Sequence, residues 1–272
     1  MKTLKILGAS AAMAIAFSAA PASAGTCIGN CGTSGADGDI GLSPTGNPSY
    51  SYVSTWDGSP TTAGEIASVG DNDGGPNTGS QFTTSLFSAA AGDSLAFYFN
   101  YITSDGAGFA DYGWAELVDS MGAHVAWLFT GRTQASGDIA PGFGLPALDA
   151  TLTPATSPII GGAPDWSLLG GDNNSCYAAG CGYTGWIEST YTIASAGTYA
   201  VVFGVTNWSD SAYASGLAWD GLALNDTSIT GGGVGAVPEP ATWAMLLLGF
   251  FAMGGLLRRQ RQVAHTMAVT YS

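Results

Sequence analysis

The chain has 272 residues, and its 20 acidic side chains outnumber its 6 lysines and arginines, which gives a formal net charge of −14 at pH 7. Between positions 25 and 237 the only basic residue is Arg132, while every carboxylate except Glu239 lies there, so this part has a charge of 1 − 19 = −18. Such a charge excludes nucleic acid as a partner, because phosphate binding needs clustered lysine and arginine, and it disfavours anionic membrane surfaces.

The first 24 residues have the pattern of a secretory signal peptide. Lys2 and Lys5 precede an apolar stretch at 6–17, and small residues just before Gly25 form a cleavage site. We therefore expect residues 1–24 to be removed on export. The body that follows, 25–230, is long enough for one domain with its own core.

Short segments of alternating polarity predict an all-β body. Apolar side chains recur at every second position in 95–101 and in 199–205, which is the period of a strand with one buried face. Further strands are expected at 40–43, 50–56, 81–87, 186–193 and 217–224. No helical stripe appears in the body. Nine or ten strands with glycine-rich turns indicate a two-sheet β-sandwich, jelly-roll-like in its connections.

Residues 114–127 predict a hairpin. Asp119 opens its tight turn and Gly122 takes the backbone angle that closes it. His124, the only histidine of the body, follows the turn on the face opposite Trp127. We expect a partly exposed strand residue there. The alternative is a catalytic base, but the chain has no G-x-S-x-G elbow and the body has no lysine.

A faint echo relates two parts of the body at an offset of 105 residues. Ser104-Asp105 follows the first apolar strand and Ser209-Asp210 follows the second, and a tryptophan comes ten residues after each serine. Two copies are too few for a repeat array. The echo therefore predicts two hairpins with the same role in opposite sheets.

The cysteines come in two close pairs, Cys27 with Cys31 and Cys176 with Cys181, the second pair within a proline- and glycine-rich loop at 141–186. In an exported chain they predict disulfides. Three connectivities are open, and we expect the local one, because each bond then closes a short glycine-containing loop. A zinc site is the alternative, but no histidine lies near.

The run Asp71-Asn72-Asp73-Gly74 favours Ca²⁺ among metal ions. Oxygen side chains stand at alternate positions before glycines, and hard cations bind such oxygens, so Asp71 and Asp73 are candidate ligands. The alternative is ordinary turn chemistry, since no glutamate closes an EF-hand loop.

Aromatic side chains beside the second cysteine pair, with amides and carboxylates among them, are candidates for sugar binding. They are Trp166, Tyr177, Tyr183 and Trp186. The alternative is that they anchor the core or the loop. The 19 carboxylates of the body also leave a glycan-cleaving pair open. No catalytic signature singles out such a pair, and we expect no enzyme.

A glycine-rich linker at 231–237 leads to an uncharged apolar run at 241–257, about 26 Å long as a helix, which is the lower limit for crossing a bilayer. Three arginines follow at once: Arg258, Arg259 and Arg261. They predict a single transmembrane helix at 241–257, a cytoplasmic tail at 263–272, and the body on the far side of the membrane. The alternative, a buried core helix, has nothing to pack on.

The order of these parts resembles the PEP-CTERM sorting signal. Residues 238–262 begin with Pro238-Glu239-Pro240, continue with Trp243 and an alanine as in the Trp-Ala variant, and end in the apolar run and the arginines. The resemblance implies that exosortase, a membrane-embedded cysteine transpeptidase-like enzyme, processes the chain near the tripeptide. The segment 263–272 is longer than is usual for this signal.

The body also resembles an uncharacterised family of exported PEP-CTERM proteins, through 31–33, 99–111, 181–186 and 204–208. This resemblance implies export and no particular activity. We therefore expect a non-enzymatic protein of the cell surface or extracellular matrix, transiently anchored by its C-terminal helix. One alternative is a carbohydrate-binding module for exopolysaccharide, and a third candidate is a glycan-cleaving enzyme.

Overall fold

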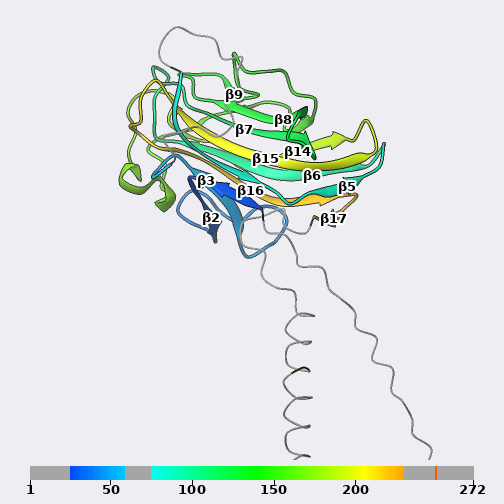
Figure 1. The fold of residues 1–272 in the computed structure, drawn as a ribbon. Helices are drawn as coiled ribbons and strands as arrows, with labels where there is room; N and C mark the ends of the chain where they lie inside the picture. Colours follow the sequence, from blue (N-terminus) through cyan, green and yellow to red (C-terminus); the bar gives the residue numbers. More distant parts are fainter. Residues whose placement is uncertain (1–24, 59–74, 230–248, 250–272) are drawn as a thin grey trace, which may run out of the picture.

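The computed structural model describes residues 25–58, 75–229 and 249, and the body within them is built of antiparallel strands (Figure 1). The first of its two main sheets has six strands in the order β1-β4-β15-β7-β8, with β5 also paired to β15. These strands are β1 (Thr26–Ile28), β4 (Pro76–Thr83), β5 (Phe87–Ala89), β7 (Tyr112–Asp119), β8 (His124–Arg132) and β15 (Gly197–Trp208).

The second sheet has nine strands in the order β10-β14-β6-β16-β3-β2, with β12, β13 and β17 joined at its margins. Its strands are β2 (Asn30–Ser34), β3 (Tyr50–Ser54), β6 (Ser94–Thr103), β10 (Thr151–Thr153), β12 (Ile160–Gly161), β13 (Gly182–Tyr183), β14 (Ile187–Thr192), β16 (Ser215–Leu224) and β17 (Thr227–Ser228). A separate pair is formed by β9 (Asp138–Ala140) and β11 (Ser157–Pro158), and one 3-10 helix, η1, covers Ser167–Asp172.

The connections confirm the jelly roll. Eight principal strands follow one another along the chain: β3, β4, β6, β7, β8, β14, β15 and β16. Numbered 1 to 8 in this order, they lie side by side as 1-8-3-6 in the nine-stranded sheet (β3-β16-β6-β14). In the six-stranded sheet they lie as 2-7-4-5 (β4-β15-β7-β8). The chain crosses between the sheets at every step except the β7–β8 hairpin. This is the strand order of two interlocked Greek keys.

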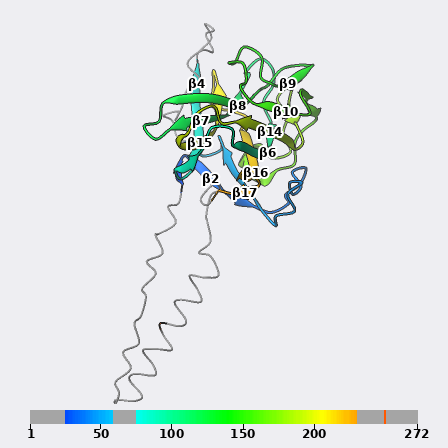
Figure 2. The ribbon, with the colours of Figure 1, turned by 90° about the vertical axis from the view of Figure 1, so that its right-hand side faces the viewer.

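The core lies between the two sheets, which Figure 2 shows from the side. The alternating apolar residues predicted at 95–101 and 199–205 are buried in it, on β6 and β15. Phe97 of β6 meets Phe203 of β15 edge to face, with ring centroids 5.1 Å apart, and Phe203 stacks on Trp219 of β16 at 4.3 Å. The period-two pattern therefore identified the central strand of each layer.

Part of the segment 141–186 covers the outer face of the nine-stranded sheet, while Leu145 packs with Tyr112 and Trp208 of the other sheet. Trp166 and Leu169 are buried at the outer face, and the ring of Trp166 lies so close over Gly216 that a Cβ on this glycine would come within 2.2 Å of it. The Trp166 Nε1–H donates a hydrogen bond to the Tyr50 hydroxyl at 2.9 Å. The long loop predicted at 141–186 therefore supplies part of a second hydrophobic layer, and it contains β10, β11, β12, β13 and η1.

The β7–β8 hairpin confirms the predicted turn. The Asp119 carboxylate accepts hydrogen bonds from two backbone amides of the turn, and Gly122 has a φ of +82°. The prediction that His124 and Trp127 face opposite sides is wrong, because their rings lie 4.6 Å apart. A bulge causes this: the register pairs His124 with Val118 but Trp127 with Glu116, so one extra residue is taken up between them.

Two predicted strands differ from the structure. Residues 40–43 form only an isolated bridge between Asp37 and Ile40, because Ile40 is an anchor in the outer hydrophobic layer. The segment 81–87 is divided between β4 and β5. At the break the Thr84 hydroxyl accepts the hydrogen bond of the Val201 amide and so takes the place of a ladder carbonyl.

Candidate functional site: the loop end of the sandwich

One end of the sandwich gathers the connections that follow β3, β6, β8 and β15. We call it the loop end, and it comprises the described segments 55–58, 104–111 and 209–214 with the residues that contact them. The strand register places these segments together, since Ser215 pairs with Thr103. The C-terminal end of the body lies at the opposite end, where β17 pairs with the last residues of β16, while β1 pairs with residues of β4 that lie midway along β15.

Asp111 is fully buried at the loop end, just before β7. Its carboxylate accepts hydrogen bonds from the Ser215 hydroxyl at 2.6 Å and from the Trp208 amide at 2.8 Å, and the Tyr101 hydroxyl donates to its carbonyl at 2.9 Å. Burial raises the pKa of Asp111 well above its usual range, and the charge of Asp105 raises it further, against the effect of the two hydrogen bonds.

Asp105 is the second buried carboxylate, with 1% of its surface exposed. Its Oδ1 accepts a hydrogen bond from the Gly106 amide at 2.6 Å, while its Oδ2 has no hydrogen-bond partner within the described part of the chain. Burial is the main cause that raises the pKa of Asp105 to about 7, with further contributions from the charges of Asp210 and Asp172. Four carboxylates therefore interact at this end.

The sequence echo explains part of this cluster. Asp105 lies in the connection from β6 to β7 and Asp210 in the connection from β15 to β16, and β6 and β15 belong to opposite sheets. Both connections cross between the layers at the loop end, so equivalent positions of the echo become neighbours in space. The strands that precede the two connections therefore lie in opposite sheets, as predicted, but neither unit is a hairpin, because each connection joins strands of different sheets.

The arginine of the body is also buried here. Arg132 is 4% exposed, and its Nε–H donates to the Ala110 carbonyl at 3.1 Å. Its guanidinium lies 5.0 Å from the ring centroids of Phe143 and Trp208, which is the range of a cation–π contact. The side chain is packed into the protein and offers no surface for an anionic ligand.

A pocket of about 260 Å³ opens at the loop end. It is lined by residues from four connected segments, chiefly Trp56, Asp57, Thr78, Asp172, Asn207 and Ser211. Trp56 is 37% exposed, and the side-chain oxygen of Asn207 is buried without a hydrogen-bond partner in the described residues. Only Asp172 belongs to the carboxylates that the sequence places among the candidate sugar-binding aromatics; the other lining residues come together only through the crossing of the sheets.

The four aromatic residues proposed for sugar binding do not converge on this pocket. Trp166 is fully buried and is a core anchor, so the prediction of an exposed platform is wrong for this residue. Trp186 donates its Nε1–H to the Gly41 carbonyl at 2.9 Å, and Tyr183 packs against the same outer layer. Tyr177 is 49% exposed and lies in a separate aromatic group with Phe109.

The calcium prediction falls on Asp71 and Asp73, which lie outside the described residues. Within residues 25–58 and 75–229 no group of three or more histidine, cysteine or acidic side chains is arranged to hold a metal ion. Calcium binding therefore remains a prediction.

His124 is exposed at the tip of the β7–β8 hairpin, and its Nδ1 lies 2.7 Å from the Glu116 carboxylate. The hairpin turn closes the strands at the end opposite the one where Tyr112 pairs with Arg132, which is the loop end. The ring is thus remote from the pocket, in keeping with the partly exposed strand residue that the sequence predicts.

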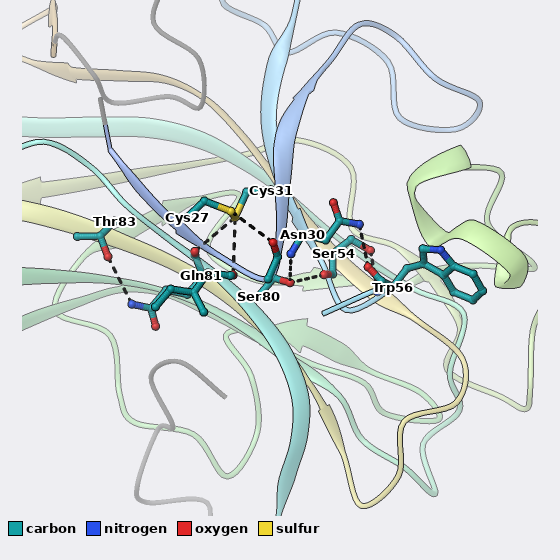
Figure 3. Close-up of a disulfide and its surroundings, with 10 residues drawn as sticks. Cys27, Asn30, Cys31, Ser54, Trp56, Ser80, Gln81 and Thr83 are labelled. Carbon is teal, nitrogen blue, oxygen red and sulfur yellow. Dashed lines mark hydrogen bonds between the residues drawn. A yellow bond between two sulfur atoms is a disulfide. The ribbon is translucent and has the colours of Figure 1, made fainter. Parts of the chain in front are cut away.

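Both disulfides have the predicted local connectivity, Cys27–Cys31 and Cys176–Cys181. Figure 3 shows the first of them beside the hydrogen bonds that lead to Trp56. Asn30 stands between its cysteines, its amide donates to the Ser80 hydroxyl, and its side chain donates to the Trp56 carbonyl, both at 2.8 Å. The disulfide therefore fixes the turn that carries Asn30, and the side chain of Asn30 binds the backbone of Trp56.

We expect the double replacement of Cys27 and Cys31 by serine to lower the free energy of unfolding by about 2 kcal/mol, because the bond closes a short loop and so restricts the unfolded chain. Urea unfolding under oxidising conditions measures this difference. The matched variant replaces Cys176 and Cys181, whose disulfide closes a loop of similar length. We expect it to lose a similar free energy of unfolding. An unchanged unfolding midpoint would contradict the prediction.

Comparison with known proteins decides the nature of the C-terminus. A family model described as the PEP-CTERM protein-sorting motif matches residues 236–262. The chain carries a PEP-CTERM sorting motif. It is an exported protein that exosortase processes, as the order of the tripeptide, apolar run and arginines indicated. No curated protein and no solved structure matches the chain significantly, and the family model leaves the body unassigned.

The PEP-CTERM motif implies a membrane-associated sorting signal, and the helix predicted at 241–257 lies outside the described residues, apart from position 249. In the part of the chain that the structure describes, no helix is both long and apolar enough to span a membrane.

Proposed function

We propose that this PEP-CTERM protein is a non-enzymatic binding protein of the cell surface or extracellular matrix, which presents its loop end to the surroundings. The observation that supports this most is the position of the loop end. Its pocket lies at the end of the sandwich opposite β17, after which the described body ends on its C-terminal side. A body held from the C-terminal side then exposes its pocket on the far side.

A carbohydrate-binding module for exopolysaccharide is the second candidate, favoured by the exposed tryptophan in a polar pocket. A glycan-cleaving enzyme is less well supported. Asp105 and Asp111, whose pKa values are raised, are buried and do not line the pocket, and the pocket carboxylate of Asp172 accepts a hydrogen bond from the Ala214 amide at 2.9 Å. Release of reducing sugar from neutral polysaccharides by the purified protein would overturn the non-enzymatic assignment.

Replacement of Glu239 by alanine is expected to keep the protein in the inner-membrane fraction, because exosortase no longer recognises the tripeptide. Fractionation of cells that express the wild-type or the variant chain measures this, with the wild type at the cell surface or in the matrix. The matched control is Glu188→Ala, which removes a carboxylate from β14 and is expected to leave sorting unchanged. A wild-type protein confined to the inner membrane would contradict the proposed function.

A further inference from the structure

We propose that the loop-end pocket binds one unit of a neutral glycan, with Trp56 as the surface on which the sugar ring stacks. This inference rests on the proposed surface function and names the ligand class of its site. It is carried by the placement of Trp56, by the hydrogen-bonding groups of the pocket and by the pocket's size and charge.

Trp56 is held as a rigid platform. Its ring lies against the backbone of Gly170 and Gly171, where an added Cβ would come within 2.1 Å and 2.7 Å of ring atoms. Its amide donates to the Ser54 hydroxyl at 3.1 Å, and its carbonyl accepts the hydrogen bond from Asn30. Figure 3 shows the indole beside η1. A ring supported in this way and still 37% exposed loses little conformational entropy when an apolar ligand face covers it.

The polar groups of the pocket require a ligand that donates hydrogen bonds. Asn207 uses its Nδ2–H to donate to the Thr78 hydroxyl at 2.9 Å, which leaves its Oδ1 as an acceptor without a partner among the described residues. The carboxylates of Asp57 and Asp172 add further acceptors. A buried acceptor without a donor is unfavourable, and a sugar hydroxyl removes this cost while the C–H face of the same ring covers the indole.

Charge decides which sugars fit. The two aspartates of the pocket and the charge of −18 on the body repel uronic acids, sulfated sugars and phosphate esters. The volume of about 260 Å³ is below the range of about 300–1,000 Å³ that is usual for drug-sized ligands, so it suits a single ring. We therefore expect millimolar affinity for a monosaccharide and tighter apparent binding when copies of the protein meet a polymer.

The test uses the exported protein purified from its own cells and an array of oligosaccharides of four kinds: neutral hexoses, N-acetylhexosamines, uronic acids and glucosamines. The neutral oligosaccharide that binds best is then titrated calorimetrically. We expect binding to a neutral member, and a loss of about ten-fold or more in affinity for Trp56→Ala, because the stacking contact is removed. Trp56→Phe keeps a ring and is expected to lose less.

The matched control is Tyr177→Ala, which removes an exposed aromatic ring that does not line the pocket. We expect this variant to bind the oligosaccharide like the wild type. Thr78→Val provides an independent variant inside the pocket if Trp56→Ala fails to fold. The proposal is overturned if no neutral oligosaccharide binds, if uronic acids or glucosamines bind better, or if Trp56 variants retain full affinity. Correct surface localisation of a protein that binds no glycan would overturn this inference and leave the proposed function standing.

Discussion

Replacement of Trp219 by alanine is expected to lower the free energy of unfolding by about 3–5 kcal/mol, the usual cost of removing a buried aromatic side chain. Trp219 is 1% exposed and connects the two sheets. Its ring stacks on Phe203 at 4.3 Å with planes only 8° apart, and its centroid lies 5.5 Å from that of Phe82. The cavity left by alanine would open beside the rings of Phe203 and Phe82, which belong to β15 and β4.

Chemical denaturation of the wild type and the variant measures this loss. Trp219→Phe keeps an aromatic ring and is expected to lose markedly less than the alanine variant. Met121→Ala serves as the control, because its side chain is 87% exposed at the hairpin turn and should change stability by less than about 0.5 kcal/mol. A loss below about 1 kcal/mol for Trp219→Ala would show that the ring stack does not hold the sheets together.

The elements that the sequence predicted well are those set by local pattern. The alternation at 95–101 and 199–205 has one meaning in a strand, since side chains two positions apart face the same side. The turn after Asp119 needed only the chemistry of an aspartate and a glycine at the two ends of a four-residue turn. The close spacing of each cysteine pair likewise favoured local bonds in an exported chain.

The elements that the sequence did not predict depend on partners far away in the chain. The sequence leaves Trp166 open as a ligand platform or as an anchor, because its environment is created by Tyr50 and Gly216, which no local pattern connects to it. The bulge beside His124 shifted a register that strict alternation had assumed. The sequence indicates only a strand residue at Trp56, because the glycines of η1 that lie against its ring are more than 100 residues away in the chain. The candidate site therefore arises from topology.

The same topology explains why the carboxylate cluster is placed where it is. A jelly roll brings alternate connections to one end, so an aspartate two residues after the end of β6 and another two residues after the end of β15 must approach each other. In a body with a charge of −18 this approach is unfavourable when all carboxylates are ionised. The fold tolerates it because Asp105 and Asp111 have raised pKa values and bind protons more readily than exposed aspartates do.

This proton uptake predicts that the protein becomes less stable as the pH rises from about 4 to about 7. In the unfolded chain an aspartate loses its proton near its ordinary pKa of 3.8, whereas Asp105 in the fold has a pKa of about 7 and keeps its proton up to that pH. Between these values the folded state binds one more proton, so raising the pH favours unfolding by up to about 1.4 kcal/mol per pH unit and a few kcal/mol in total. Asp111, with its pKa also raised, acts in the same direction.

Asp105→Asn tests this prediction, because it keeps an oxygen for the Gly106 amide and removes the titrating group. Urea unfolding at a series of pH values should show a flatter dependence between pH 4 and pH 7 for the variant, and the largest gain over the wild type near pH 7 and above. Asp226→Asn is the matched control, since it removes the same charge from an exposed turn where asparagine also accepts the positive φ of 61°. An equal pH dependence in wild type and Asp105→Asn would show that Asp105 is ionised in the fold throughout this range, and the cluster would then need another source of neutralisation.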